Sequence, residues 1–378
     1  MDDSALVSPP ALAGPLRLEP FRALQLDPSR VGDPATARLY ARPYRGVATR
    51  VRSWIDRGDI MQDTTPALYL HEYADGARAI RGVVGALDVS RRATSVRDAA
   101  VLPHERIHPS QAAELAQRMQ EMKLNPAPIL LAQRGPQPAR DLLRMVRREV
   151  PTRQYLDRAG QSHRIWAIRD PATIGNLERA WDPSRAIIAD GHHRYAAYLR
   201  NQEAEPGTAS DLGLAMIIDH DETPFHLGAI HRVLAGVTLG EAREAAHALG
   251  LSATDLDEPA APDARDRAIA IVGDGRQWTR LALPLADGGS AVSYLHEQLI
   301  PAFRRQPRQV YFERTVENAM LRARRGRNLV VLLPELTVGQ LWATVAEGGL
   351  LPEKATSFQP KPHAGVFIRC LLDAQPAP

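Results

Sequence analysis

The sequence predicts an α+β or mixed α/β protein, and three observations carry that prediction. Short apolar runs bounded by turn residues recur along the chain, as at 185–190 and 329–333, and are typical of buried strands. Segments with apolar residues at helical spacing lie between them, as at 45–57. The predicted strands and helices mix without strict alternation, which favours this class over a doubly wound parallel fold.

The first part of the chain gives the clearest elements after its N-terminal arm. Residues 1–37 are proline-rich and weakly patterned, so we expect an irregular arm with one strand near 16–18. Ser110 is a good N-cap, followed by helical spacing up to 123. The pattern further on predicts helices at 45–57, 110–123, 173–180 and 192–201, and strands at 67–73, 79–87, 126–132, 164–168, 185–190 and 213–219.

The pattern changes after Gly240, where turn signals become denser. This part predicts an acidic loop at 254–263, helices at 241–249, 293–304, 315–324 and 338–347, a hairpin of 268–272 with 277–283, and strands at 329–333 and 365–370. We therefore divide the chain into an arm (1–37), a catalytic core (38–239), an accessory α/β region (240–333) and a C-terminal segment that returns to the core (334–378).

Composition excludes several classes of protein. The 378 residues carry 47 Lys+Arg against 44 Asp+Glu, and this net charge of +3 argues against a nucleic-acid partner bound by bulk electrostatics. The single cysteine, Cys370, excludes an internal disulfide and a multi-cysteine metal site. No apolar run reaches membrane-helix length, and the start has no signal-peptide pattern, so we expect a cytoplasmic protein without a membrane partner.

The first candidate site is the string Ala189-Asp-Gly-His-His-Arg194, where a predicted strand ends and a helix begins. Cations in the first turn oppose the helix dipole, so His192, His193 and Arg194 are better explained by a phosphate bound there. Asp190 offers the carboxylate oxygen that Mg²⁺ prefers. The alternative is an Asp-Gly turn before a solvated basic helix face.

The second candidate is Pro103-His-Glu-Arg-Ile-His-Pro109, which formally matches the H-E-x-x-H zinc pattern. Zinc proteases need both histidines on one continuous helix, and Pro109 biases His108 away from helical geometry. We therefore expect His104 and Glu105 to lie on a loop, where Glu105 is either a catalytic base or a solvent-facing acid.

The third candidate is the segment 351–362, which holds two of the three lysines of the chain, Lys354 and Lys361. In a chain that otherwise uses arginine, these lysines and the hydroxyl of Ser357 indicate phosphate binding, and a solvated loop is the alternative. His231-Arg232 follows an apolar stretch, and a core or interface histidine is expected there rather than a ligand.

Four strings together resemble the family called domain of unknown function 1015. They are Pro20–Leu24, Leu102–Glu105, Ala189–Arg194 and Leu351–Phe358 with Pro360-Lys361, and the resemblance runs from about residue 15 onward. The Asp-Gly-His-His-Arg string is also similar to that of free L-serine kinases. The resemblance implies a nucleotide-binding core of the partition-protein B/sulfiredoxin-like fold, with insertions and a smaller C-terminal α/β region.

This resemblance implies a kinase that uses ATP or ADP with Mg²⁺ to phosphorylate a small hydroxyl compound. Free L-serine is the lead candidate substrate. Glu105, beside His104, would be the catalytic base. Asp190 and His192 would bind Mg²⁺, and Asp190 and Arg194 would act in catalysis. The nucleotide phosphates would contact Gly191, His192, His193, Arg194, Lys354, Ser357 and Lys361. The resemblance leaves the oligomeric state open.

Two departures from the family keep other functions open. The family's Pro-Pro-Tyr-Asp segment is replaced by Arg42-Pro-Tyr-Arg45 in a shortened region, which favours a regulatory nucleotide-binding protein without transfer chemistry. Glu105 and Asp190 are also 85 positions apart, farther than in the small serine kinases. A third hypothesis is a metal-dependent hydrolase that uses the histidines at 104, 108, 192 and 193.

Overall fold

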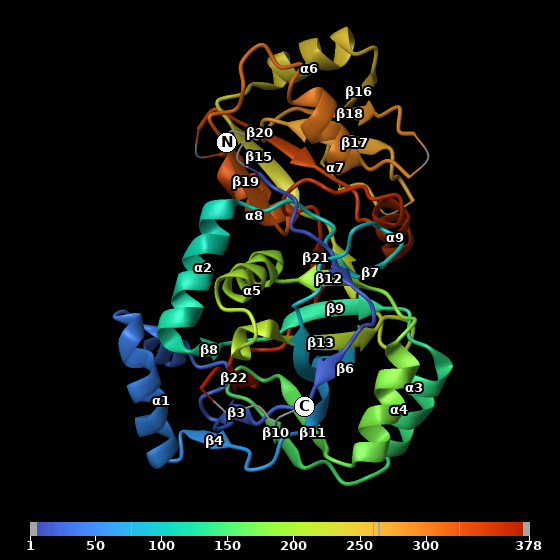
Figure 1. Ribbon diagram of the computed structural model, residues 1–378. Helices are drawn as coiled ribbons and strands as arrows, with labels where there is room; N and C mark the ends of the chain where they lie inside the picture. The colour runs from blue at the N-terminus through green and yellow to red at the C-terminus, as the bar shows by residue number, and fades with distance from the viewer. Residues whose placement is uncertain are drawn as a thin grey trace. The chain divides into compact units, whose positions relative to one another are not determined.

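The structure is a computed structural model that describes residues 6–76, 78–259, 261–263, 265–286, 288–324 and 326–372 (Figure 1). Its contacts divide the chain into two units. The smaller unit comprises Leu6, His104–Arg106 and His226–Gln359, and the larger unit comprises Val7–Pro103, Ile107–Phe225 and residues 360–372.

A long mixed sheet forms the centre of the larger unit. Its strands follow the order β1 (Leu12–Ala13), β7 (Ala99–Leu102), β12 (Ala186–Asp190), β9 (Ile129–Gln133), β13 (Leu212–Asp219), β6 (Arg78–Asp88), β5 (Leu68–Asp75), β11 (Ser162–Ile168) and β10 (Arg153–Leu156), with β2 (Leu18–Glu19) also paired to β6. The β12–β7 and β13–β9 pairs are parallel and the other pairs are antiparallel. This pairing makes the protein mixed α/β, as the sequence predicts.

Helices cover both faces of that sheet (Figure 1). One pair is α2 (Pro109–Met122) with α5 (His192–Ala204), and the other is α3 (Gln137–Val146) with α4 (Pro171–Trp181). Gly213 of β13 permits a close approach of α5, because a Cβ there would lie 2.3 Å from the ring of Tyr198. Tyr195 and Tyr198 accordingly enter the core shared by sheet and helices.

A second, antiparallel sheet of the larger unit joins distant parts of the chain. Its order is β4 (Ile60–Gln62), β3 (Ala23–Leu26), β22 (Ile368–Cys370) and β8 (Leu124–Asn125). The helix α1 (Val47–Asp56) contacts β4, and 3₁₀ turns at Pro34–Tyr40 and Tyr44–Gly46 precede it. Because β22 lies between β3 and β8, the C-terminal part of the described chain is an inner strand of this sheet.

The smaller unit has its own antiparallel sheet and core. The strand order is β16 (Ser252–Leu256), β18 (Trp278–Ala282), β17 (Ile269–Gly273), β20 (Asn328–Leu332), β15 (His231–Ala235) and β19 (Gln309–Glu313). Its helices are α6 (Leu239–Ala248), α7 (Ala291–Tyr294), α8 (Val316–Ala323) and α9 (Val338–Ala346), and β14 (His226–Gly228) pairs with β21 (Ser357–Gln359). Capping boxes at Thr238 and Thr337 fix the starts of α6 and α9.

Most predicted elements are confirmed within a few residues, and the differences have local causes. The expected loop at 254–263 is wrong in part, because β16 extends the hairpin edge through Leu256. The expected helix at 293–304 starts at Ala291 and changes to a π-helical turn at Leu295–Leu299. The N-terminal arm contains β1, β2 and β3, whose short strands pair with partners far along the chain. The four-segment domain division stays a prediction.

Among the described residues, the helices are all too short or too polar to cross a membrane.

Candidate functional site

The predicted strand–turn–helix unit exists in the larger unit as β12, Gly191 and α5. Gly191 has φ +95°, and a Cβ there would lie 2.9 Å from Ile129 and 3.0 Å from the Arg194 guanidinium, so the turn requires glycine. As the N-cap of α5, Gly191 has no side chain to accept from the first-turn amides. An anion is favoured there by the helix dipole.

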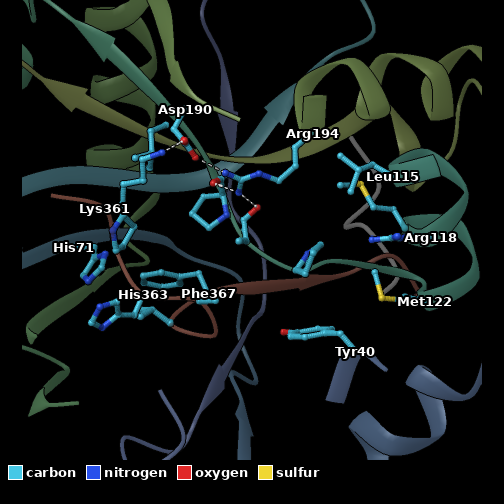
Figure 2. A pocket seen from close by; sticks show the side chains of 18 of the residues that line it. Tyr40, His71, Leu115, Arg118, Met122, Asp190, Arg194, Lys361, His363 and Phe367 are labelled. Atoms are coloured by element: carbon cyan, nitrogen blue, oxygen red, sulfur yellow. Dashed lines mark hydrogen bonds and ion pairs between the residues drawn. The ribbon is translucent and has the colours of Figure 1, made fainter. Parts of the chain in front are cut away.

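Asp190, at the end of β12, forms ion pairs with two cationic side chains (Figure 2). Its Oδ1 pairs with Lys361 Nζ, and its Oδ2 accepts from Arg194 Nη2 at 2.6 Å. Arg194 Nη1 also donates to the carbonyls of Ala127 and Pro128, at 3.1 and 2.6 Å. The guanidinium is therefore fixed by three acceptors, whereas the Lys361 ammonium is held by one carboxylate.

These three charged groups line a cavity of about 460 Å³ in the larger unit (Figure 2). Asp190, Arg194 and Lys361 lie at one end. The rest of the wall includes apolar side chains, among them Leu115, Met119, Met122, Val366 and Phe367. An apolar wall with a few convergent polar groups is typical of small-molecule sites.

The two histidines of the turn differ in environment. His192 is 4% exposed. The Nε2 of His193 accepts a hydrogen bond from the backbone N–H of His108 at 3.3 Å, and the two rings stack with centroids 6.4 Å apart. His108 is itself the extended N-cap residue of α2, so His104 to His108 do not lie on one helix. These residues therefore do not form a zinc-protease helix, as the sequence predicts.

In the smaller unit, His104 and Glu105 contact Leu351 and Thr356, which belong to the predicted lysine-bearing segment 351–362. The carbonyl of His104 accepts from Leu351 N–H at 2.7 Å, and Glu105 forms a parallel bridge with Leu351. The buried His104 ring hydrogen-bonds through Nε2 to the Thr356 hydroxyl at 2.9 Å. Residues 252 positions apart in the sequence are thereby brought together.

Arg232 is the residue that holds this segment in place, and sequence reasoning missed its role. Its fully buried guanidinium donates to the carbonyls of Ile230, Glu353 and Lys354 and to Nε2 of His296. Burial lowers the pKa of Arg232 to about 9, against the opposing effect of Glu105 and Glu353. Glu105 therefore lies within electrostatic range of the Arg232 guanidinium.

Lys354 and Ser357 occupy different settings in that segment. Lys354 has a left-handed φ of +52°, pairs with Glu353 at 2.9 Å and lies 4.5 Å from the ring centre of Phe312. Ser357 is 5% exposed in β21, where its hydroxyl accepts from Gln359 at 3.1 Å. Lys354 and Ser357 belong to the smaller unit and Lys361 to the larger one. That Glu105 faces the Asp190–Arg194 turn stays a prediction.

A buried histidine chain beside the cavity was not anticipated from the sequence. Nε2 of His71 lies 3.1 Å from Nδ1 of His163, and Nε2 of His163 lies 3.1 Å from Oδ2 of Asp157. Burial lowers the pKa of both His71 and His163, so both rings are neutral near pH 7. Nothing in the local pattern marks these residues, because they come from different strands of the sheet.

The protein is mixed α/β, with a cavity at a strand–turn–helix junction. A family model described as "Protein of unknown function (DUF1015)" matches residues 8–299. The match spans most of the chain, so the protein belongs to this family. It confirms the family resemblance, and three of the four strings lie within the matched residues, whereas the string at 351–361 lies beyond them.

Comparison with curated proteins finds no match for this chain. Several solved structures are similar. A free serine kinase variant in complex with ADP has 15% identity and a TM-score of 0.41, covering 74% of this chain and 87% of that one. Free serine kinase with AMP has 14% identity and a TM-score of 0.40, covering 74% and 88%. C-terminally truncated SbnI from Staphylococcus aureus has 14% identity and a TM-score of 0.42, covering 78% and 90%.

Acidification is expected to destabilise the smaller unit through His231, whose Nδ1 accepts from Leu333 N–H. Burial, with Arg232 beside it, lowers the pKa of His231 to about 4 from 6.5. Between pH 6.5 and about pH 4, His231 is therefore protonated in the unfolded chain but stays neutral in the folded state. Stability is complete above pH 6.5 and falls towards pH 4, by up to about 3 kcal/mol. Hydrogen exchange of the amides in β15 and β20 measures this loss of stability. If His231→Gln showed the same pH dependence as the parent, His231 would not be its cause.

Proposed function

We propose that this protein is a nucleotide-dependent phosphotransferase that acts on a small hydroxyl compound, with free L-serine as the lead substrate. The observation that carries the proposal is the cavity in which Asp190, Arg194 and Lys361 gather at one end, while Arg118 adds one cation to a wall that is otherwise largely apolar. A nucleotide has the same division between a flat base and a charged tail.

The phosphates are proposed to lie at the charged end. Lys361 is held by one carboxylate, and its ammonium can move to a phosphate oxygen at little cost. Arg194 adds a fixed positive charge, and the amides that open α5, with Gly191, His192 and His193, favour an anion. The base is proposed to lie against Met119, Met122 and Phe367.

Glu105 is the proposed catalytic base, with Lys354 and Ser357 as further phosphate contacts. It accepts the proton of the attacking hydroxyl while that oxygen bonds to the terminal phosphorus and the bond to the nucleotide oxygen breaks. The Arg232 guanidinium lies within electrostatic range of Glu105. Lys354 or Lys361, with Arg194, stabilises the charge on the phosphoryl group.

Mg²⁺ does not fit Asp190 as the structure has it. Both carboxylate oxygens are already paired with cations, and the imidazole of His192 is a weak ligand for this hard ion. In the proposal, Mg²⁺ therefore enters with the phosphates of ATP or ADP. No step of the proposed transfer depends on a preformed magnesium site.

Lys361→Gln is expected to weaken ADP binding by about 10- to 100-fold, or about 1.4 to 2.7 kcal/mol. Its binding of adenosine, which lacks phosphate, should change little, because the apolar wall is intact. Calorimetry with ADP, AMP and adenosine measures the difference, and Lys123→Gln, outside the cavity, is the matched control. Equal losses for ADP and adenosine would contradict a phosphate contact at Lys361.

A regulatory nucleotide-binding protein is the second candidate, and the shortened Arg42–Arg45 region favours it. Tyr40 and Tyr44, on either side of Arg42-Pro43, line the cavity. The departure from the family pattern therefore falls at the site itself. Phosphate transfer from ATP and from ADP to a panel of amino acids and sugars separates the two: tight nucleotide binding with no transfer to any acceptor supports the regulatory candidate.

A further inference from the structure

A second cluster of polar side chains adjoins the cavity, away from Asp190. Asp157 follows β10, His163 belongs to β11, and His363 follows the predicted phosphate lysine by two positions. His71 and His363 line the cavity and lie near Phe367 in Figure 2. The proposed phosphotransfer uses none of these four polar residues.

The carboxylate of Asp157 has one oxygen anchored and one shared by two imidazoles. Oδ1 accepts the backbone N–H groups of Ala159 and Gln161, at 2.9 Å each. Oδ2 lies 3.1 Å from Nε2 of His163 and 2.5 Å from Nδ1 of His363. These three atoms all lie within 4.8 Å of one another. The backbone bonds thus aim Oδ2 at the two ring nitrogens.

Burial makes the charge of this cluster significant. The side chains of Asp157 and His163 are fully buried, and only His363, 35% exposed, opens outward. Among the ion pairs of the described residues, Asp157 has these two imidazoles as partners and no lysine or arginine. A carboxylate removed from water is stabilised by hydrogen bonds, which Asp157 has, and further by a compensating positive charge.

His71 supplies an outer hydrogen bond. Its Nε2 lies 3.1 Å from Nδ1 of His163, the ring nitrogen that faces away from Asp157. A metal-bound imidazole almost always uses its other nitrogen in such a bond, which fixes the tautomer and the ring orientation.

We propose that Oδ2 of Asp157, Nε2 of His163 and Nδ1 of His363 bind a divalent transition-metal ion, Zn²⁺ fitting best. Two imidazoles and a carboxylate form a common zinc donor set that leaves a fourth position open, and of the three residues His363 lines the cavity. Ligand atoms in a tetrahedron around zinc are about 3.3 Å apart, from a bond length of about 2 Å. The 3.1 Å pair fits already, His363 must withdraw from Oδ2 by less than about 1 Å, and the two ring nitrogens must settle at this spacing from a separation of at most 4.8 Å.

The competing explanation is a hydrogen-bonded latch without metal. The Gln161 side chain already binds the segment 361–363. It donates to the Lys361 carbonyl and accepts from the His363 N–H, at 3.0 Å each. Asp157 and His363 would then only reinforce that attachment. The two explanations differ in whether the full chain retains zinc, which a measurement without substrate decides.

The test uses the tag-free full chain, stripped of metal and titrated with Zn²⁺ and then with Co²⁺. We expect one tight equivalent of Zn²⁺ by calorimetry and by elemental analysis, with the visible absorption of tetrahedral Co²⁺. His363→Gln, at the exposed edge, should abolish tight binding. His71→Gln should weaken it by about 10- to 100-fold. His247→Gln, an exposed histidine on α6, is the matched control.

The outcomes divide cleanly. Retention of one zinc that depends on His363 but not on His247 supports the site. No tight zinc in the parent, or equal zinc in the parent and His363→Gln, overturns it and leaves the latch. Circular dichroism of each variant checks folding, and Asp157→Asn provides a second ligand variant. Because no nucleotide is present, failure here leaves the proposed phosphotransfer untouched.

Discussion

Glu105→Gln is expected to bind nucleotide as the parent does while its phosphoryl transfer slows by about 10²- to 10⁴-fold. The amide preserves the shape of the side chain and its place beside Leu351, but it cannot accept the hydroxyl proton. Because Glu105 is proposed to act on the acceptor, the binding of ADP should not depend on its charge. Single-turnover transfer, measured beside calorimetric ADP binding, separates the two effects.

The matched control for this carboxylate is Glu258→Gln, an exposed acid in the loop after β16. Its transfer rate should equal that of the parent. The rate of Glu105→Gln should also stay low as the pH rises, because no carboxylate is left to ionise. Transfer at the parent rate would remove Glu105 from the role of base and leave the proposed mechanism without a proton acceptor.

Arg232→Met is expected to destabilise the smaller unit by about 3–5 kcal/mol, as breaking a buried charged network does. Methionine fills part of the volume but leaves the carbonyls of Ile230, Glu353 and Lys354 without their donor. Buried acceptors that lose a partner incur their full desolvation cost. The segment that carries Lys354 should loosen first, because two of its carbonyls are bound by this one side chain.

Hydrogen exchange resolved by peptide is the suitable measurement, since it reports the two units separately. Faster exchange should appear at 351–357 and in β15, with little change in β5 and β6 of the larger unit. Arg276→Met, on the exposed turn between β17 and β18, is the control and should behave like the parent. Unchanged protection around Lys354 in Arg232→Met would show that the segment is held by other contacts.

Local patterns predicted the elements with strong periodicity and clear ends. β12 and α5 were predicted because an apolar run ends in Asp-Gly and a helix follows, and the structure confirms this junction. α3 was missed because its proline and arginines dilute the apolar pattern, although Ala139 still reaches the core. The strands of the N-terminal arm were mostly missed because two to four residues give too little pattern to recognise.

In the candidate site too, residues adjacent in the sequence were predicted, whereas contacts between distant residues mostly were not. Asp190, Gly191 and Arg194 form a local string, so their neighbourhood was readable from the sequence. The ion pair of Asp190 with Lys361 joins residues 171 positions apart, and composition alone hinted at it through the rarity of lysine. The sequence predicted a core or interface histidine at His231 but no role for Arg232, because nothing adjacent in sequence reveals that it binds the carbonyls of residues 353 and 354.

The inner position of β22 has a consequence for biosynthesis. The cavity-lining residues within 361–367 and the strand β22 leave the ribosome only after the whole smaller unit has been translated. At ordinary elongation speeds that delay is roughly ten seconds. During this delay β22 is missing from between β3 and β8 in the nascent larger unit. The unpaired strand edges left there are sites at which chaperones or incorrect strands would bind first.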